Sequence, residues 1–212
     1  MKVFVINLDE AEDRWINYEG LGYERWCATP YSQVSEEDSL KVVSMWNINP
    51  KTHLCKTACL LSHLSLWEHI VKNKINDVLI LEDDAKQVNE LHNCSFKDDG
   101  ITYVGGSTYS PKMTGGYKKI ELDKGIHLVN HNDYRVLQTV SYYIPNYEIA
   151  KKLIEFIKDK KRWRAVDVML GEVNKIMNVY ISYPASFVER KEPSQIQTFK
   201  NKYSTQQYEF LK

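Results

Sequence analysis

One stretch of the chain, residues 77–85, constrains the fold more than any other, and its sequence is DVLILEDDA. Residues 78–81 form an unbroken aliphatic run of strand length, which is typical of a strand covered on both faces in a mainly parallel sheet. Three carboxylates follow at once, and because burying an unpaired carboxylate is very unfavourable, they must lie where the strand leaves the sheet. We therefore predict an α/β fold with an acidic cluster at the edge where open α/β sheets bind their ligands.

The acidic cluster consists of Glu82, Asp83 and Asp84. Successive residues of a strand point to opposite sides, so Glu82 and Asp84 are expected to face one direction and Asp83 the other. Two hard oxygen donors in this spacing suit Mg²⁺ or Mn²⁺ that is also held by the phosphates of a substrate. A solvated acidic turn is the alternative interpretation, but the position directly after an aliphatic strand favours a site.

The composition argues against some classes of function. Lys and Arg together number 28, as do Asp and Glu, so the formal net charge is zero. This balance gives no support to a general nucleic-acid binder or to a binder of anionic membranes. No segment approaches the ~18 consecutive apolar residues of a membrane span. The apolar run that begins at Val3 stops at Asn7, short of a signal peptide. We therefore expect a cytoplasmic protein, or the cytoplasmic part of a longer polypeptide.

The cysteines show no CxxC pairing; they are Cys27, Cys55, Cys59 and Cys94. Cys55 and Cys59 lie four residues apart in a helical pattern, where two buried free thiols are the expected state in a reducing compartment. A zinc site built from them would need His53 or His63 as a partner, and we favour the free thiols.

The hydrophobic pattern predicts alternating strands and helices along the rest of the chain. The predicted strands are residues 2–8, 23–28, 78–81, 101–104, 126–129, 136–144 and 179–183. The predicted helices begin at residue 11, cover 36–46, 56–71 and 147–158, and begin again at residue 165. Residues 1–196 are expected to form a single domain, and residues 197–212 a peripheral helix or a linker. Residues 107–124, which include Gly115 and Gly116, are predicted to form a loop around the site.

The turn after the first strand is a candidate phosphate site. Asp9 is expected to cap the helix that follows, with Glu12 completing a capping box. The free N–H groups at a helix N-terminus favour phosphate, and Arg14 would add a bidentate clamp on a diphosphate. A surface Arg paired with Glu10 is the alternative for Arg14.

Three specific motifs follow one another along the chain: VINLD at residues 5–9 with Asp13 and Arg14, CLLSH at 59–63 with Trp67, and LILEDDA at 79–85. Weaker ones are SYYI at 141–144, AKKL at 150–153, Val166 with Asp167, Pro184, Val188, and SQI at 194–196. Together they resemble glycosyltransferase family 25, the lipooligosaccharide-biosynthesis and collagen-galactosyltransferase group. The chain departs from that family at Ala58, because the family usually has Gly directly before the equivalent of Cys59.

The resemblance implies a GT-A-type fold, a Rossmann-like mixed and mainly parallel sheet flanked by helices. It also implies a nucleotide-sugar donor, with Mn²⁺ or Mg²⁺ under the diphosphate. The acidic cluster becomes a DxD-like motif in which Asp84 and Glu82 bind the metal, while Glu82 or Asp83 reaches the ribose, or reaches the metal through water. The implied donor-binding residues are Ile6, Asn7, Leu8, Arg14, Thr29, Ser62, His63, Glu82 and Asp83.

Sugar transfer with inversion, which the resemblance favours, needs a carboxylate that takes the proton of the acceptor hydroxyl. Asp167 is the first candidate for this base or for gripping the acceptor, Asp133 the second and Glu189 the third. A plain helix N-cap is an equally good interpretation of Asp167.

The predicted function is a metal-dependent glycosyltransferase that moves a hexose, glucose or galactose by default, from a UDP-sugar to a glycan acceptor hydroxyl. The alternatives are a catalytically silent nucleotide-sugar or glycan-binding module and a metal-dependent phosphodiesterase or nuclease. The neutral charge disfavours the nuclease, because it suggests no basic substrate channel. We expect no nucleic-acid partner.

Overall fold

A seven-stranded mixed sheet forms the centre of the computed structural model, which describes residues 1–42, 50–91, 96–109, 120–130, 135–160 and 162–190. Five strands run parallel, and β9 and β7 run antiparallel to their neighbours. The order across the sheet is β2 (Glu24–Cys27), β1 (Lys2–Asn7), β3 (Val78–Glu82), β9 (Ser141–Ile144), β5 (Gly100–Tyr103), β10 (Asn178–Tyr183) and β7 (Gly125–Leu128). The predicted α/β class with a mixed, mainly parallel sheet is confirmed.

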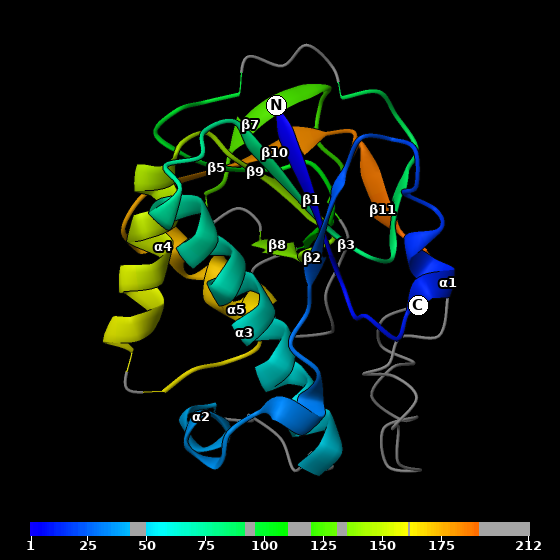
Figure 1. Ribbon diagram of the computed structural model, residues 1–212. Coiled ribbons are helices and arrows are strands. Elements are labelled where there is room, and N and C mark those ends of the chain that lie inside the picture. The colour runs from blue at the N-terminus through cyan, green and yellow to red at the C-terminus, as the bar shows by residue number, and fades with distance from the viewer. Residues whose placement is uncertain (43–49, 92–95, 110–119, 131–134, 161, 191–212) are drawn as a thin grey trace.

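Three helices cover one face of this sheet: α3 (Pro50–Lys72), α4 (Tyr147–Asp159) and α5 (Val166–Gly171) (Figure 1). The remaining helices are short: α1 (Glu12–Trp15), α2 (Glu36–Lys41) and the 3-10 turns η1 (Tyr31–Gln33) and η2 (Val173–Lys175). The described helices include none with the length and apolar character that crossing a lipid bilayer requires.

Strict alternation in β1 and β3 assigns each side chain to one face of the sheet. Phe4, Ile6, Val78 and Ile80 belong to the core under α3, α4 and α5. Their neighbours along the strands, among them Val5 and Leu81, belong to a second core on the opposite face, together with Tyr18 beyond α1. The period of two therefore continues past the end of β3, with Glu82 on the α3 face and Asp83 on the α1 face.

Two small ribbons lie beside the main sheet. β4 (Ala85–Gln87) pairs antiparallel with β11 (Phe187–Glu189), and β6 (Ser107–Tyr109) pairs antiparallel with β8 (Arg135–Leu137). The first ribbon begins one residue after the acidic cluster, and the backbone N–H of Arg190 donates to the carbonyl of Asp84 at 2.7 Å. A segment more than a hundred residues away thus fixes the turn that carries the carboxylates.

Several predicted elements are corrected by the structure. The segment 136–144 is two strands, because Gln138 adopts a φ of 72° that interrupts an extended chain. α3 begins at Pro50 rather than Lys56, since Pro is well accommodated in the first turn of a helix. α2 begins after the predicted Ser35 cap and ends at Lys41, not near residue 46. Part of the predicted loop 107–124 is β6. Residues 197–212 lie outside the described part of the chain.

Candidate functional site

A cleft of about 140 Å³ opens at the carboxyl ends of β1 and β3, where the sequence predicts a site. α3 forms one wall with a stripe of mostly small side chains at helical spacing. The other walls come from the end of β1, the chain after β2, and the acidic cluster. The lining residues are Ile6, Leu8, Ala11, Arg14, Ala28, Thr29, Tyr31, Cys55, Ala58, Cys59, Ser62, His63, Glu82, Asp83 and Asp84.

Asp83 is held from both sides by side chains of the N-terminal strand and helix. Its Oδ2 accepts from Asn7 Nδ2 at 2.9 Å, and its Oδ1 accepts from Arg14 Nη1 at 2.6 Å. Burial raises the pKa of Asp83, and it outweighs the Arg14 charge and the Asn7 hydrogen bond, which lower it. Asn7 is only 1 % exposed, and its Oδ1 accepts in turn from Arg25 Nε at 2.7 Å. Both carboxylate oxygens of Asp83 are therefore bonded, and they connect the end of β3 to Asn7 and Arg14.

Glu82 points the other way, toward the fully buried His63 of α3. His63 is the end of a series of hydrogen bonds. Trp67 Nε1 donates to Tyr142 Oη at 2.9 Å, and Tyr142 Oη lies 2.7 Å from His63 Nδ1. If Tyr142 donates its only proton to Nδ1, the Nε2 proton faces Glu82 Oε1, 3.5 Å away. The hydroxyl of Thr139 also donates to Oε1. Burial raises the pKa of Glu82, but the His63 and Thr139 contacts outweigh it, so the pKa is lowered and the carboxylate stays ionised.

Asp84 differs from both neighbours because, within the described part of the chain, its buried Oδ1 has no hydrogen-bond partner. Burial raises the pKa of Asp84 to about 8, and the charges of Glu82, Glu189 and Asp83 add to the effect. A buried carboxylate oxygen without a hydrogen-bond donor is unfavourable unless a ligand supplies the missing interaction. Crowded hard oxygen donors of this kind fit Mg²⁺ or Mn²⁺, so the residues present suit the predicted cation.

Two further predicted carboxylates lie near the cluster. Asp167 is the second residue of α5, and its Oδ1 accepts from the N–H of Val168 at 2.8 Å. Burial raises the pKa of Asp167, and the charge of Glu82 raises it further. Burial and the charge of Glu82 also raise the pKa of Glu189, whose Oε2 accepts from Gln138 Nε2. The N-cap position of α5 is Ala165, so the plain-cap interpretation of Asp167 is wrong.

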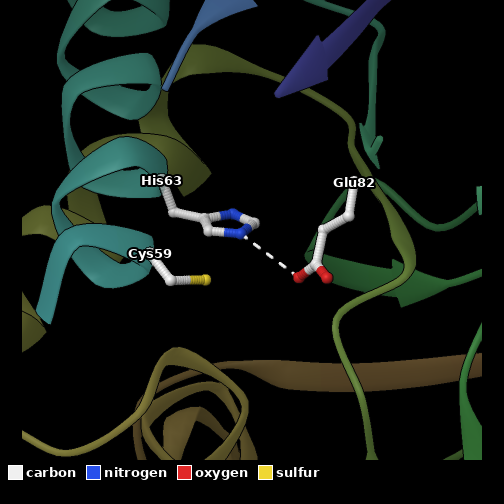
Figure 2. Close-up of side chains that lie close together, drawn as sticks. All are labelled: Cys59, His63 and Glu82. Atoms are coloured by element: carbon white, nitrogen blue, oxygen red, sulfur yellow. Dashed lines mark ion pairs between the residues drawn. The ribbon is translucent and has the colours of Figure 1, made fainter. Parts of the chain in front are cut away.

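Cys59 completes a compact group with His63 and Glu82 at the base of the cleft. The Sγ, imidazole and carboxylate ligand atoms all lie within 4.8 Å of one another, and Figure 2 shows that α3 supplies two of them and the end of β3 the third. Burial raises the pKa of the Cys59 thiol well above its usual value, and the nearby carboxylates raise it further. Cys27, Cys55 and Cys59 are free, which for Cys55 and Cys59 agrees with the prediction; Cys94 lies outside the described residues.

Most predicted donor-binding residues meet in this cleft. Ile6, Leu8, Arg14, Thr29, Ser62, His63, Glu82 and Asp83 line it, as does the metal candidate Asp84. Asn7 does not line it and acts on Asp83 instead. Asp167 is not a lining residue, although its charge acts on Cys59 and Glu82. Asp133 lies outside the described residues.

The expectations for the turn after β1 were partly wrong. α1 has Ala11 as its N-cap, with no side-chain cap, so the Asp9 capping box does not form. Asp9 instead accepts a hydrogen bond from Cys27 Sγ at 2.6 Å. α1 has only four residues and offers a weak dipole. Arg14 pairs with Asp83 rather than with Glu10.

Sequence reasoning missed part of the α3 wall. Cys55 and Ala58 join Cys59, Ser62 and His63 on one helical face, and small residues at this spacing are the signal that would have predicted a wall rather than a packed core. Ala58 lines the cleft where the resembled family usually has Gly. Tyr31 of η1 gave no such signal, because its position depends on the turn that follows β2.

The fold and cleft together define an α/β protein with a carboxylate-rich cleft at the carboxyl edge of a mainly parallel sheet, the edge where open α/β sheets bind their ligands. Residues 1–104 match the family model of glycosyltransferase family 25, described as LPS biosynthesis protein. This match, over just under half of the chain, supports the family that the sequence motifs indicated, and that family indicates a glycosyltransferase.

Other comparisons are distant. No curated protein sequence matches the chain. The inositol-1-phosphate CTP transferase from T. maritima matches with a TM-score of 0.40 and 12 % identity, over 99 % of this chain and 94 % of that one. The nucleoside-diphosphate-sugar pyrophosphorylase from Vibrio cholerae RC9 matches with a TM-score of 0.35 and 12 % identity, over 93 % and 79 % of the two chains.

Proposed function

We propose that the chain is a metal-dependent glycosyltransferase that moves a hexose, glucose or galactose, from a UDP-sugar to the hydroxyl of a glycan acceptor with inversion. The observation that carries this proposal is the buried, unpartnered Oδ1 of Asp84 in a cleft at the carboxyl end of β3. The family match to residues 1–104 supports the reaction class. We also propose that residues 1–196 act as a single cytoplasmic domain.

Asp84 and Glu82 are the proposed metal-binding residues, because both carboxylates line the cleft and Asp83 is already bonded to Asn7 and Arg14. When bound there, Mn²⁺ or Mg²⁺ would act as a Lewis acid on the diphosphate leaving group. Glu82 is suited to this work since His63 and Thr139 keep it ionised and oriented. The crowding of Glu82, Asp83, Asp84 and Glu189 makes a cation favourable on electrostatic grounds alone.

The nucleotide is proposed to lie along the wall between α3 and the chain after β2. The backbone N–H of Thr29 donates to Ser62 Oγ at 2.8 Å, and Ser62 Oγ donates to the carbonyl of Ala58 at 2.7 Å, so this part of the wall is held before any ligand arrives. Arg14 also lines the cleft, and its guanidinium forms an ion pair with Asp83 of the acidic cluster. Its pairing with Asp83 orients the guanidinium for a diphosphate.

Asp167 is proposed to take the proton from the acceptor hydroxyl. A general base works best when its pKa lies nearer the working pH, and burial raises the pKa of Asp167. Its hydrogen bond from the Val168 N–H fixes the carboxylate at the start of α5. Glu189 is the second candidate among the described carboxylates, because burial raises its pKa too and it lies close enough to Asp84 to affect it.

The test is incubation of the full chain with a panel of UDP- and GDP-sugars, with and without Mn²⁺, while free nucleotide is measured. Slow metal-dependent release of UDP, accelerated by a glycan acceptor, is the expected result, because transferases hydrolyse their donors slowly when no acceptor is present. Binding of a nucleotide sugar without release would identify a silent module. Cleavage of a nucleic acid or another phosphodiester would identify a phosphodiesterase, and either result would overturn the proposal.

A further inference from the structure

In the group formed by Cys59, His63 and Glu82, the thiol and the imidazole are donors that the proposed sugar transfer does not use as metal ligands. It combines a thiol, an imidazole nitrogen and one carboxylate oxygen, all within 4.8 Å of one another (Figure 2). Mg²⁺ and Mn²⁺ favour sets made of oxygen alone, whereas a mixed sulfur, nitrogen and oxygen set suits Zn²⁺ and its borderline-soft neighbours.

His63 supplies the second, independent observation. Its side chain is 0 % exposed, and Nε2 is a buried polar atom for which the described residues offer no hydrogen-bond partner; it is directed at Glu82 across 3.5 Å. A tetrahedral ion at normal bond lengths of about 2.0–2.1 Å holds a nitrogen and an oxygen ligand roughly 3.3–3.4 Å apart. The imidazole and carboxylate therefore already have the separation of two ligands of one small cation, and Cys59 Sγ must approach by less than about 1.5 Å to complete the set.

The surroundings also resemble the outer shell of a metal site. A ligating histidine usually donates its other ring N–H to a fixed acceptor, which sets the ring orientation. Tyr142 Oη lies 2.7 Å from His63 Nδ1 and is itself fixed by Trp67 Nε1 at 2.9 Å. With a cation on Nε2, Nδ1 carries the ring proton and donates it to Tyr142 Oη. The imidazole thus suits either state by a change of tautomer, without moving.

We propose that Cys59, His63 and Glu82 form a binding site for a thiophilic divalent cation, with Zn²⁺ the best match, beside the Mg²⁺ or Mn²⁺ site proposed for the diphosphate, with which it shares Glu82. The cation bonds to Sγ, Nε2 and one carboxylate oxygen, and the thiol proton leaves to the solvent as the Sγ bond forms. Three protein ligands leave the fourth tetrahedral position facing the cleft, available to water or to a ligand. Binding at this site does not depend on transferase activity.

The test uses the full chain, reduced with a phosphine so that no added thiol competes, and titrated with Co²⁺ as a spectroscopic substitute for Zn²⁺. Co²⁺ bound to a thiolate gives a sulfur-to-metal charge-transfer band in the near ultraviolet. We expect this band to saturate at one equivalent and to disappear when Zn²⁺ displaces the Co²⁺. Competition with a chromophoric chelator then gives the Zn²⁺ affinity.

Three cysteine variants identify the ligand. Cys59→Ser removes the proposed sulfur, while Cys55→Ser, one turn earlier on α3, and Cys27→Ser, at an exposed position of β2, are the matched controls. We expect Cys59→Ser to lose the band and to bind Zn²⁺ more than about 100-fold more weakly, since even outer-shell changes weaken metal binding about 10- to 100-fold. Both controls should keep the band and the affinity.

Other outcomes overturn the proposal. They are the absence of a band in the parent chain, a band that persists in Cys59→Ser, and a band lost in a control variant. Thermal unfolding of each metal-free variant separates a lost ligand from a lost fold. His63→Gln provides a second test with Cys59 intact: the tetrahedral spectrum should be lost, and its survival at parental affinity would exclude the imidazole.

Discussion

The carboxylates at the end of β3 differ in how they are bonded. On the α1 side, Asp83 has both oxygens bonded, to Asn7 and to Arg14, and Asn7 is itself held by Ala11 and Arg25. In the cleft that α3 lines, Asp84 Oδ1 and His63 Nε2 are buried, and neither has a hydrogen-bond partner among the described residues. The same acidic sequence therefore contains one structural carboxylate, Asp83, and one carboxylate with an unbonded oxygen, Asp84.

This difference indicates which carboxylates of the acidic cluster are structural and which are candidates for function. Buried polar groups in a folded protein are almost always bonded, so a fully bonded one needs no further explanation, whereas an unbonded one marks a place for a ligand. Loss of a bond on the α1 side should mainly lower stability. Loss of a carboxylate on the α3 side should mainly lower activity, and at Asp84 it should relieve repulsion between like charges.

The largest expected effect is that of Asp84→Asn. We expect metal-dependent nucleotide release to fall at least about 1000-fold, since the variant lacks the charge that binds the cation, and a metal supplies several kcal/mol of transition-state stabilisation. The free energy of unfolding should stay unchanged or increase. Asp123→Asn, at an exposed position, is the matched control and should behave as the parent. Near-normal activity of Asp84→Asn would remove Asp84 from the metal site.

Asp167→Asn should reduce transfer about 100-fold while donor binding stays within about threefold, because general-base catalysis contributes roughly 10²- to 10⁴-fold to rate. Asn preserves the acceptor for the Val168 N–H, so the start of α5 keeps its bond. Transfer to a glycan acceptor and equilibrium binding of UDP-sugar with Mn²⁺ are measured on the same preparation. A loss of binding as large as the loss of transfer would make Asp167 a structural residue of the site instead of its base.

On the bonded side, Asn7→Ala should lower the free energy of unfolding by about 2–3 kcal/mol, because it leaves Asp83 Oδ2 and the Arg25 Nε–H without their partner. Chemical denaturation measures this change. The control Asn178→Ala removes an exposed amide that bonds to Asp99, and it should change stability by less than about 0.5 kcal/mol. Equal effects of the two variants would contradict the structural role assigned to the α1 side.

The sequence was sufficient to predict the location of the site. An aliphatic run followed by acids predicted β3 and the position of its carboxylates, because continuous burial and charge are local properties of the chain. Alternation along the strand also predicted that Glu82 and Asp83 point to opposite sides. The helical pattern predicted α3 itself, whereas Ser62 and His63 were predicted from the family resemblance.

The sequence could not predict how each carboxylate is bonded, because the partners are distant in the chain. Asp83 and Asn7 are 76 residues apart, and His63 and Tyr142 are 79 apart. Nothing near His63 in the sequence distinguishes a bonded core histidine from one with an unpartnered nitrogen. The break at Gln138 was equally hidden, since a φ of 72° there reflects the path of the chain between β8 and β9 rather than a turn motif.

The smallest expected effect is a change of the free energy of unfolding with pH, and it comes from the unbonded carboxylate of Asp84. In the metal-free folded chain the pKa of Asp84 is raised to about 8, whereas in the unfolded chain it is about 3.9. Between these values the folded state binds a proton that the unfolded state does not bind, so this group lowers stability as the pH rises from about 4 toward 8. With EDTA present, the parent should therefore lose on the order of 1–2 kcal/mol relative to Asp84→Asn between pH 5 and pH 8, allowing for partial solvent screening.

Adding Mn²⁺ at pH 8 should restore the stability of the parent and leave Asp84→Asn almost unchanged, because a bound cation stabilises the ionised carboxylate only where that carboxylate exists. Denaturation curves at both pH values, with EDTA or with Mn²⁺, give the difference in free energy of unfolding between the parent and Asp84→Asn in each of the four conditions. A gap between parent and variant that does not change with pH would mean that Asp84 is ionised and solvated. The contrast between the bonded and the unfilled side of β3 would then be wrong.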